Sequence, residues 1–302
     1  MSGIENSLLV VVVDTNPIWW GQSRDEEQIK LTLTRCLDSV MVFANSHLMM
    51  NHSNKLAVIA SHTNKSYFLY PQKEHSKAVS TAEDDSQIRQ VDGKYELFAQ
   101  VDEEIKSEVK NLILGGLEGE LHADSLLAGS LAMSLCYIHR IEKEHRSIGS
   151  SLSSRIMVIK GSEDNPAQYM NFMNTVFTAQ KQNVVIDACI LDNDSGLLQQ
   201  ACDITGGVYL KIPQLHALLL YLIWVFLPEP SMRHKLTLPP KAQVDYRAAC
   251  FCHRNLIDIG YVCSVCLSIF CSFSPICSTC QTTFRFLGPP KGSKKKSKKS
   301  SN

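Results

Sequence analysis

Residues 8–14 read Leu-Leu-Val-Val-Val-Val-Asp. Six apolar residues in a row, rich in β-branched valine, are typical of a strand that is buried on both faces, as the central strands of parallel sheets are. The run ends in the carboxylate of Asp14. In doubly wound α/β sheets, ligands and metals bind beyond the carboxyl ends of the middle strands. Asp14 therefore lies where a functional site is expected.

Five further strand-like segments follow, and segments with apolar residues at helical spacing separate most of them. The five segments are 55–61, 66–70, 155–160, 184–191 and 208–212. This alternation predicts an α/β fold with a doubly wound, mostly parallel six-stranded sheet that helices cover on both faces. Residues 71–95 are polar and have no period, which predicts a surface loop. The apolar segment 215–227 is interpreted as a buried helix that closes this domain.

The composition excludes several classes of protein. Apolar residues make up 44% of the 302 residues and charged residues 20%, as in globular proteins. We expect no secretory signal, because the first apolar run is short and stops at Asp14. We expect no membrane span, because segment 215–227 is shorter than the ~20 residues that cross a bilayer. The net charge is zero and six lysines lie in the last twelve residues, so the remainder carries −6 and does not resemble a DNA-binding surface.

The cysteines predict a zinc module near the C-terminus. Seven of the eleven cysteines fall between Cys250 and Cys280. Cys263-x-x-Cys266, ten further residues and then Cys277-x-x-Cys280 form the spacing of a structural zinc site. Four thiolates complete a tetrahedral shell and leave no position for water, so the predicted zinc is structural and stabilises a segment too short to bury its own core.

Four more candidate ligands accompany this set, and they leave the number of zinc ions open at one or two. These residues are Cys250, Cys252, His253 and Cys271. They could bind a second zinc, interleaved with the first site as in the cross-brace of RING domains. Alternatively, they pack as small buried hydrophobic residues, or one of them substitutes within the first site.

Other residues give weaker signals. We interpret the three histidines His47, His52 and His62 as exposed polar residues rather than metal ligands. Four cysteines in apolar patterns are predicted to fill core positions: Cys36, Cys136, Cys189 and Cys202. Trp19 and Trp20 are adjacent, so they cannot both face one core in regular structure. One of them covers the site at Asp14 or belongs to a partner surface, where tryptophan is enriched.

The first 227 residues resemble a von Willebrand factor A domain. The resemblance rests on the first strand ending in Asp14, on the six strands in α/β order, and on the run Ile204-Thr205-Gly206-Gly207-Val208-Tyr209. It implies a metal-ion site built from a D-x-S-x-S motif, a threonine before a middle helix and an aspartate after the fourth strand. Residues 14–18, Asp-Thr-Asn-Pro-Ile, keep only the first carboxylate.

The rest of that metal site is also altered. Ser125 can stand in for the threonine, but Lys160-Gly161 occupies the place of the aspartate. Glu163 and Asp164 would restore the site only if their loop bent back. Because a hard divalent cation requires several oxygen ligands in fixed geometry, we expect no Mg²⁺ at the Asp14 site.

Together with the cysteine module, nearly the whole chain resembles the family of smaller von Willebrand factor A-type core subunits of TFIIH, the general factor of RNA polymerase II transcription and nucleotide excision repair. The segments that carry the resemblance are Asp14–Pro17, Cys250–Asn255, Cys263–Cys266 and Cys277–Cys280. The resemblance implies a nuclear, non-enzymatic scaffold subunit. It implies as partners the larger subunit, which has a von Willebrand-type domain and a RING-like zinc domain, and the other core subunits, including helicases.

We therefore predict four parts: a von Willebrand factor A-like domain over 1–227, a proline-rich linker over 228–247, a zinc module over 248–286 and a disordered lysine-rich tail over 287–302. Two alternative functions stay open, namely a RING-type ubiquitin ligase module and a cation-dependent ligand-binding domain. Direct DNA contact by the module is expected to be weak or indirect, because Cys250–Cys280 contains one arginine, Arg254, and no lysine.

Overall fold

The computed structural model describes residues 6–21, 31–72, 89–115, 124–147, 149, 152–165, 168–240, 243–253 and 255–284. The predicted tail 287–302 and Arg254 lie outside these residues. The chain forms two compact units, Met1–Asp245 and Tyr246–Asn302. The first unit therefore includes most of the segment that we interpreted as a linker.

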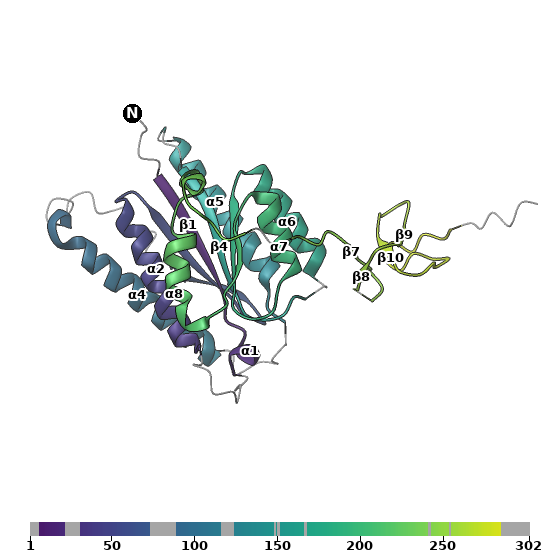
Figure 1. Ribbon diagram of the computed structural model, residues 1–302, viewed down its shortest axis with the longest axis horizontal. Helices are drawn as coiled ribbons and strands as arrows, with labels where there is room; N and C mark the ends of the chain where they lie inside the picture. The colour runs from purple at the N-terminus through teal and green to yellow at the C-terminus, as the bar shows by residue number, and fades with distance from the viewer. Residues whose placement is uncertain are drawn as a thin grey trace, which may run out of the picture. The chain divides into compact units, whose positions relative to one another are not determined.

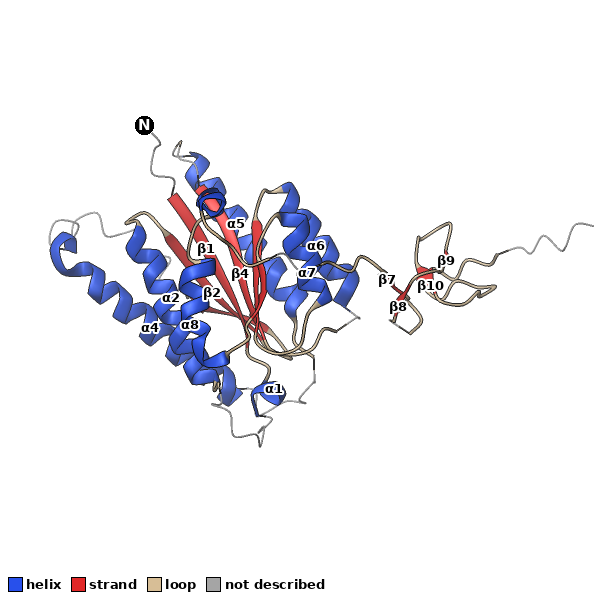
Figure 2. Ribbon diagram, in the orientation of Figure 1, coloured by secondary structure: helices blue, strands red, loops and turns tan. Residues whose placement is uncertain are grey.

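The first unit is built on a six-stranded sheet with the strand order β3-β2-β1-β4-β5-β6 (Figure 2). The strands are β1 (Asn6–Asp14), β2 (Lys55–Ser61), β3 (Ser66–Tyr70), β4 (Leu152–Lys160), β5 (Val185–Ile190) and β6 (Tyr209–Lys211). All neighbouring strands are parallel except β3, which pairs antiparallel with β2 at the edge. The predicted mostly parallel, doubly wound sheet is confirmed.

Strand β1 lies at the centre of the sheet because its side chains supply both cores. Leu9, Val11 and Val13 belong to one hydrophobic cluster, whereas the alternate residues Leu8, Val10 and Val12 belong to the other. All six are fully buried. An unbroken apolar run is required where successive side chains point to opposite faces and both faces are covered.

Helices cover the two faces of the sheet (Figure 1). One face carries α2 (Leu33–Met50), α4 (Arg89–Gly115) and α8 (Leu218–Tyr221), and the other carries α5 (Leu127–Ser147), α6 (Tyr169–Lys181) and α7 (Gly196–Thr205). The short helix α1 (Pro17–Gly21) follows β1 directly. Helix α4 begins at Arg89, so the prediction of a loop over 71–95 is wrong for its last residues; residues 73–88 lie outside the described part of the chain.

The predicted buried helix 215–227 is only half buried. A 3₁₀ turn (Leu215–Ala217) leads into α8, which continues as a π-helical turn (Leu222–Phe226). Leu218 and Leu222 are buried, but Leu220 is 55% and Trp224 72% exposed. The segment therefore packs with one face on the sheet and leaves an apolar face at the surface. Among the described residues, no helix is long and apolar enough to cross a membrane.

A buried arginine holds the end of this segment against the sheet. Arg155 lies on β4. Its Nη1 donates to the carbonyls of Phe226 at 2.6 Å and Pro228 at 3.0 Å, and its Nη2 donates to the carbonyl of Leu227 at 2.9 Å. These carbonyls have no further helical turn to accept from, so the guanidinium satisfies them. Burial lowers the pKa of Arg155 to about 10.

A second buried arginine pairs with a sheet carboxylate. Arg233 lies in a 3₁₀ turn (Pro230–Lys235) and donates to both carboxylate oxygens of Asp187 on β5, at 2.7 and 2.5 Å. Both side chains are buried. Asp187 also accepts from the amide of Val208 at 2.8 Å. This bidentate ion pair fastens the segment after α8 to the centre of the domain.

Three interpretations of single residues are wrong. His47 and His62 are buried rather than exposed, whereas His52 is exposed as expected. His62 is held by a hydrogen bond between Nδ1 and the carbonyl of Thr15 at 3.0 Å. Cys136 is exposed rather than a core residue; the other three cysteines of that set are buried.

The burial of His47 predicts a pH-dependent stability. Burial, and to a smaller extent the nearby charge of Arg155, lowers the pKa of His47 to about 4. As the pH falls below the ordinary histidine pKa of about 6.5, His47 binds a proton in the unfolded chain. In the folded chain His47 stays neutral until about pH 4, so protonation favours the unfolded state. Stability is therefore expected to fall between pH 6.5 and 4, by roughly 3 kcal/mol at most. Urea unfolding at several pH values measures this loss.

Two variants isolate the contribution of His47. His47→Leu removes the titrating group and is expected to flatten the pH dependence, whereas His52→Gln, at the exposed histidine, is expected to leave the slope unchanged. Equal slopes in wild-type and His47→Leu proteins would contradict the assignment.

The second unit contains little regular structure. Two two-stranded sheets pair β7 (Ala248–Ala249) with β8 (Leu256–Ile257) and β9 (Tyr261–Val262) with β10 (Ile269–Phe270). Its buried cluster consists of Cys263, Phe270 and Cys277, with a few partly buried residues packed around it. A core of this size is too small to hold a domain together without additional cross-links.

Candidate functional sites

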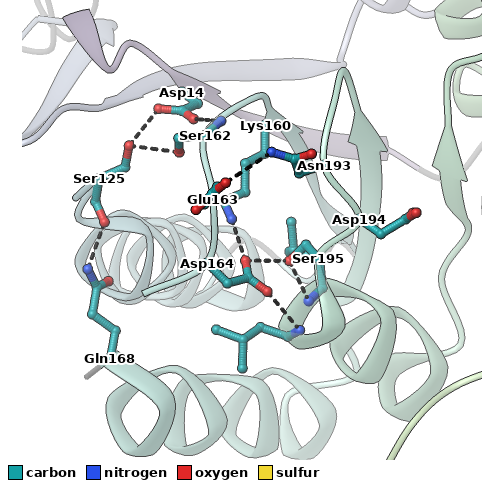
Figure 3. A network of polar contacts seen from close by, with 12 residues as sticks. Asp14, Ser125, Lys160, Ser162, Glu163, Asp164, Gln168, Asn193, Asp194 and Ser195 are labelled. Carbon is teal, nitrogen blue, oxygen red and sulfur yellow. Dashed lines mark hydrogen bonds and ion pairs between the residues drawn. The ribbon is translucent and has the colours of Figure 1, made fainter. Parts of the chain in front are cut away.

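The carboxylate of Asp14 lies at the point where the strand order of the sheet reverses, between the carboxyl ends of β1 and β4. Its Oδ1 accepts a hydrogen bond from the Ser125 hydroxyl at 2.7 Å and from the Asn16 amide at 3.1 Å. Its Oδ2 accepts from the amides of Gly161 at 3.3 Å and Ser162 at 2.9 Å. Figure 3 shows the contacts of Asp14 with Ser125 and Ser162. Four donors use the four lone-pair positions of a carboxylate.

The structure brings Ser125 to Asp14, as the resemblance implied, but it directs the acidic residues of the next loop elsewhere. Lys160 forms an ion pair with Asp164, which also accepts from the Ser195 hydroxyl at 2.7 Å. Glu163 accepts from the Asn193 side chain at 3.3 Å. The loop reaches Asp14 through backbone amides, but its acidic side chains Glu163 and Asp164 point to other partners (Figure 3). A closed network of polar contacts within the chain therefore stands where the resemblance implied a metal site.

Two members of this network were not anticipated from the sequence. Ser162 donates its amide to Asp14, and its hydroxyl lies 3.1 Å from that of Ser125. Gln168 accepts from the amide of Ala128 at 3.2 Å and donates to the carbonyl of Ser125 at 2.7 Å, so it holds Ser125 at the start of α5. Ser162 and Gln168 belong to no sequence motif, so their part in the network is visible only in the structure.

Trp19 covers the loop that binds Asp14, which is one of the two roles predicted for the tryptophan pair. A Cβ atom on Gly161 would lie 2.5 Å from the Trp19 ring, so a larger residue there would push the ring away. Trp19 donates to Asp192 at 3.3 Å, and Trp20 donates to the carbonyl of Asp14 at 2.8 Å. The two rings meet edge to face with centroids 4.5 Å apart. Helix α1 thus closes the network from one side.

Asp14→Asn is expected to destabilise the first unit by about 1–3 kcal/mol, because the new amide group places N–H donors opposite donors of the network. Urea unfolding of the chain measures the change. Asp38→Asn, at an exposed position of α2, serves as the control and is expected to have no measurable effect. Equal stabilities of the two variants would show that the network does not contribute to the fold.

The four cysteines of the predicted zinc site come together in the second unit. The Sγ atoms of Cys263 and Cys280 lie 3.7 Å apart, and those of Cys266 and Cys277 lie 3.6 Å apart. Tetrahedral zinc with Zn–S bonds of about 2.3 Å separates its sulfur ligands by roughly 3.8 Å. This cluster, called the four-cysteine cluster below, can therefore hold a metal ion and its geometry is consistent with zinc.

Two equivalent turns present these cysteines. The segments 263–268 and 277–282 share the pattern Cys-Ser-x-Cys-x-Ser/Thr. In each turn the first cysteine amide donates to the carbonyl five residues later, at 2.9 Å. The residue after the second cysteine is left-handed, with φ 60° for Leu267 and 59° for Gln281. The repeat explains why both pairs of thiols point to one centre.

Hydroxyl groups in these turns favour thiolates. The Ser268 hydroxyl lies 3.1 Å from the Cys266 sulfur, and the Thr282 hydroxyl lies 3.1 Å from the Cys280 sulfur. The contacts with Ser268 lower the pKa of Cys266 to about 6, and those with Thr282 lower the pKa of Cys280. Thiolate, rather than thiol, is the form that binds metal.

The other predicted ligands form a second cluster. The candidate ligand atoms of Cys250, Cys252, His253 and Cys271 all lie within 4.8 Å of one another. Only Cys250 is buried; Cys252 and His253 are exposed and Cys271 is intermediate. The alternative of four small buried residues therefore does not describe this group.

Comparisons with known proteins cover almost the whole chain. A family model described as transcription factor Tfb4 matches residues 6–281. The chain is 37% identical over 279 residues to the general transcription and DNA repair factor IIH subunit tfb4 of Schizosaccharomyces pombe, covering 92% of this chain and 89% of that protein. It is 40% identical over 255 residues to the general transcription factor IIH subunit 3 of Dictyostelium discoideum, covering 82% and 67%.

The structure is similar to the crystal structure of the TFIIH p34 N-terminal domain. The two are 28% identical with a TM-score of 0.60, and the match covers 73% of this chain and 97% of that one. The α/β fold predicted from the sequence, with its mostly parallel six-stranded sheet, is thus shared with this solved domain.

Proposed function

We propose, because the chain belongs to the transcription factor Tfb4 family, that it is a non-enzymatic structural subunit of the core of the transcription and DNA repair factor TFIIH. In this role it would support RNA polymerase II transcription initiation and nucleotide excision repair in the nucleus through protein–protein contacts. Relatives that align with this chain over most of their length are named as subunits of that factor. Family membership is the observation that carries the proposal.

The polar network at Asp14 supports a structural rather than a catalytic role. Catalysis by a carboxylate or hydroxyl requires a group free to reach a substrate. Here all four lone-pair positions of Asp14 accept from the chain itself, and Lys160 pairs with Asp164. The network therefore fits a preformed rigid surface better than a reactive site.

We propose that the four-cysteine cluster binds one structural zinc ion through Cys263, Cys266, Cys277 and Cys280. A closed shell of four sulfurs leaves no position for water or substrate. Its task is to fold the module, so that the module can present its surface.

The surface of the second unit supports a role in protein contacts. Several of its large apolar residues are exposed, including Ile259 at 88% and Leu267 at 70%; the others among the described residues are Tyr246, Tyr261, Val262, Val265, Phe273 and Ile276. Apolar groups concentrated on so small a unit are typical of interaction sites. We propose the larger von Willebrand-type subunit of TFIIH, with its RING-like zinc domain, as the partner, and other core subunits, including helicases, as further neighbours.

A second contact is proposed on the first unit, at the edge of the sheet that carries the Asp14 network. There Ile18 is exposed beside Trp19, which packs on Gly161. This edge would face the zinc domain of the larger subunit. Direct DNA contact is proposed to be weak or indirect, because the chain apart from its lysine tail carries a net charge of −6.

Native mass spectrometry of the chain co-expressed with the larger subunit tests the proposal. We expect a one-to-one complex. The double change Val265→Glu with Leu267→Glu is expected to weaken it by at least tenfold, because charges enter an apolar contact. Leu114→Glu, at an exposed apolar residue of α4, is the control and should assemble normally. A stable monomer that ignores the larger subunit would overturn the scaffold proposal.

The cation-dependent alternative is tested by heating the chain with and without magnesium. A ligand that binds only the folded state raises the melting temperature. Because the network already occupies Asp14, we expect millimolar magnesium chloride to leave the melting temperature of the first unit unchanged. A rise that depends on magnesium concentration would support a cation-binding domain instead.

The ubiquitin ligase alternative is tested directly by a transfer assay with ubiquitin, activating enzyme and a panel of conjugating enzymes. The family comparisons do not favour a ligase. We expect no ubiquitin chains above the background of the conjugating enzymes alone. Chain formation that disappears in a Cys277→Ser variant would contradict the non-enzymatic role.

A further inference from the structure

We propose that residues 236–240 and 243–245, called the strap below, shorten the tether of the second unit, so that the two units bind one partner as a single bivalent contact. The sequence predicted a linker over 228–247. The structure instead holds the strap on the first unit at both of its ends. The two contacts are those proposed above with the larger subunit, and this role of the strap rests on them.

The strap begins at a fixed point. Arg233 donates to both carboxylate oxygens of Asp187, and its Nε donates to the carbonyl of Pro228 at 3.3 Å. The amide of Leu236, the first residue of the strap, donates to the carbonyl of Arg233 at 3.1 Å. A bidentate ion pair between buried side chains is both strong and specific in geometry. This end of the strap is therefore held on β5.

The strap ends at a second fixed point, on α7. The buried side chain of Gln200 donates from Nε2 to the carbonyl of Asp245 at 2.7 Å. A buried amide that lost this partner would find no water to replace it, so the contact is costly to break. Asp245 is the last residue of the first unit. Two residues, Tyr246 and Arg247, separate it from β7.

Between these ends the strap covers a hollow. Leu238, Pro239, Pro240 and Val244 line one side of a cavity of about 130 Å³, and α7 and the turn that leads into β6 line the other side. Side chains that border a void lack packing contacts on that side. The two end contacts, rather than close packing of the middle, therefore hold the strap in place.

The length of the tether decides how readily the second contact follows the first. Two residues reach at most roughly 7 Å. Without the Gln200 contact the tether would run from His234 to Arg247, which is fourteen residues. A flexible chain of that length spans roughly 20 Å on average. Effective concentration falls as about the −3/2 power of tether length, so a sevenfold longer tether lowers it by roughly 20-fold.

Equilibrium binding of the full chain to the larger subunit tests this consequence. Gln200→Met removes the amide donor and keeps the length of the side chain, and it is expected to weaken binding by roughly 5- to 20-fold. Gln180→Met is the matched control and should bind normally, because Gln180 is exposed on α6 and donates to the carbonyl of Ile204 at 3.3 Å, away from the strap.

An insertion separates tether length from damage to the strap. Twelve glycine and serine residues placed between Asp245 and Tyr246 bring the tether to the same fourteen residues and leave the Gln200 contact intact. This variant is expected to lose as much affinity as Gln200→Met. An insertion that changes the affinity by less than about twofold would overturn the proposal.

NMR relaxation of the chain alone tests the strap without the partner. We expect backbone order parameters near about 0.85 for Val244 and Asp245 in the wild-type chain, and values below about 0.6 in Gln200→Met. Low values in the wild-type chain would overturn the strap whatever the binding assay shows. High values in a chain that does not bind the larger subunit would refute the scaffold proposal, and with it the bivalent contact, while upholding the strap.

Discussion

Replacing Cys277 with serine is expected to release zinc from the four-cysteine cluster and to unfold the second unit. Structural zinc in small modules contributes on the order of 10–16 kcal/mol of apparent binding free energy at neutral pH, which is also folding free energy. Cys277 belongs to the small buried cluster of this unit. The backbone between Tyr246 and Phe284 should therefore become sensitive to protease, while the α/β unit keeps its melting temperature.

Limited proteolysis combined with zinc analysis measures both effects on the same sample. Cys136→Ser is the matched control, since it removes a cysteine that lies exposed on α5. Chelation of zinc from the wild-type chain should reproduce the Cys277→Ser digestion pattern. A Cys277→Ser chain whose second unit stays protected would mean that zinc is not what holds this unit together.

The second large effect is expected from Arg233→Met. The change leaves the buried carboxylate of Asp187 without its bidentate partner. Removing one member of a buried ion pair costs about 3–5 kcal/mol, because the other charge stays in a medium of low polarity. For a domain of this size, that loss lowers the melting temperature by roughly 6–20 °C.

Differential scanning calorimetry measures the shift. Arg146→Met serves as the control, because Arg146 is 76% exposed in its side chain and pairs with Glu142 within one helix; such pairs contribute about 0.3–0.5 kcal/mol. The double variant Arg233→Met with Asp187→Asn should recover part of the stability, since it removes the unpaired charge. Similar melting temperatures for Arg233→Met and Arg146→Met would exclude a structural role for the buried pair.

The features that could be predicted from the sequence are those that depend on the pattern of apolar residues or on the spacing of metal ligands. Six apolar residues from Leu8 to Val13 predicted the central strand, because a strand covered on both faces admits no polar alternation. The two Cys-x-x-Cys pairs predicted the four-cysteine cluster, because each turn presents both thiols to one side. Both features depend on residues close together in the chain.

The features that were missed depend on partners far apart in the chain. Arg233 was part of an expected linker, and nothing near it in the sequence indicates that it pairs with Asp187 on β5. His47 was interpreted as an exposed polar residue, but its position on α2 places its side chain in the core. Trp224 belongs to an unbroken apolar run, 217–227, so composition could not show which face of it packs on the sheet. Burial of polar groups is decided by tertiary contacts, which periodicity does not record.

The central place of β1 has a consequence for how the chain folds during synthesis. One edge of β1 pairs with β2, which follows soon after it, but the other edge pairs with β4, where Val10 lies opposite Ile156. Contacts between such distant segments close slowly. Until β4 has been made, a valine-rich strand with no charge before Asp14 has an open edge, which is the kind of template on which chains aggregate. A nascent chain of this protein that stops before β4 is therefore expected to depend on chaperones to stay in solution.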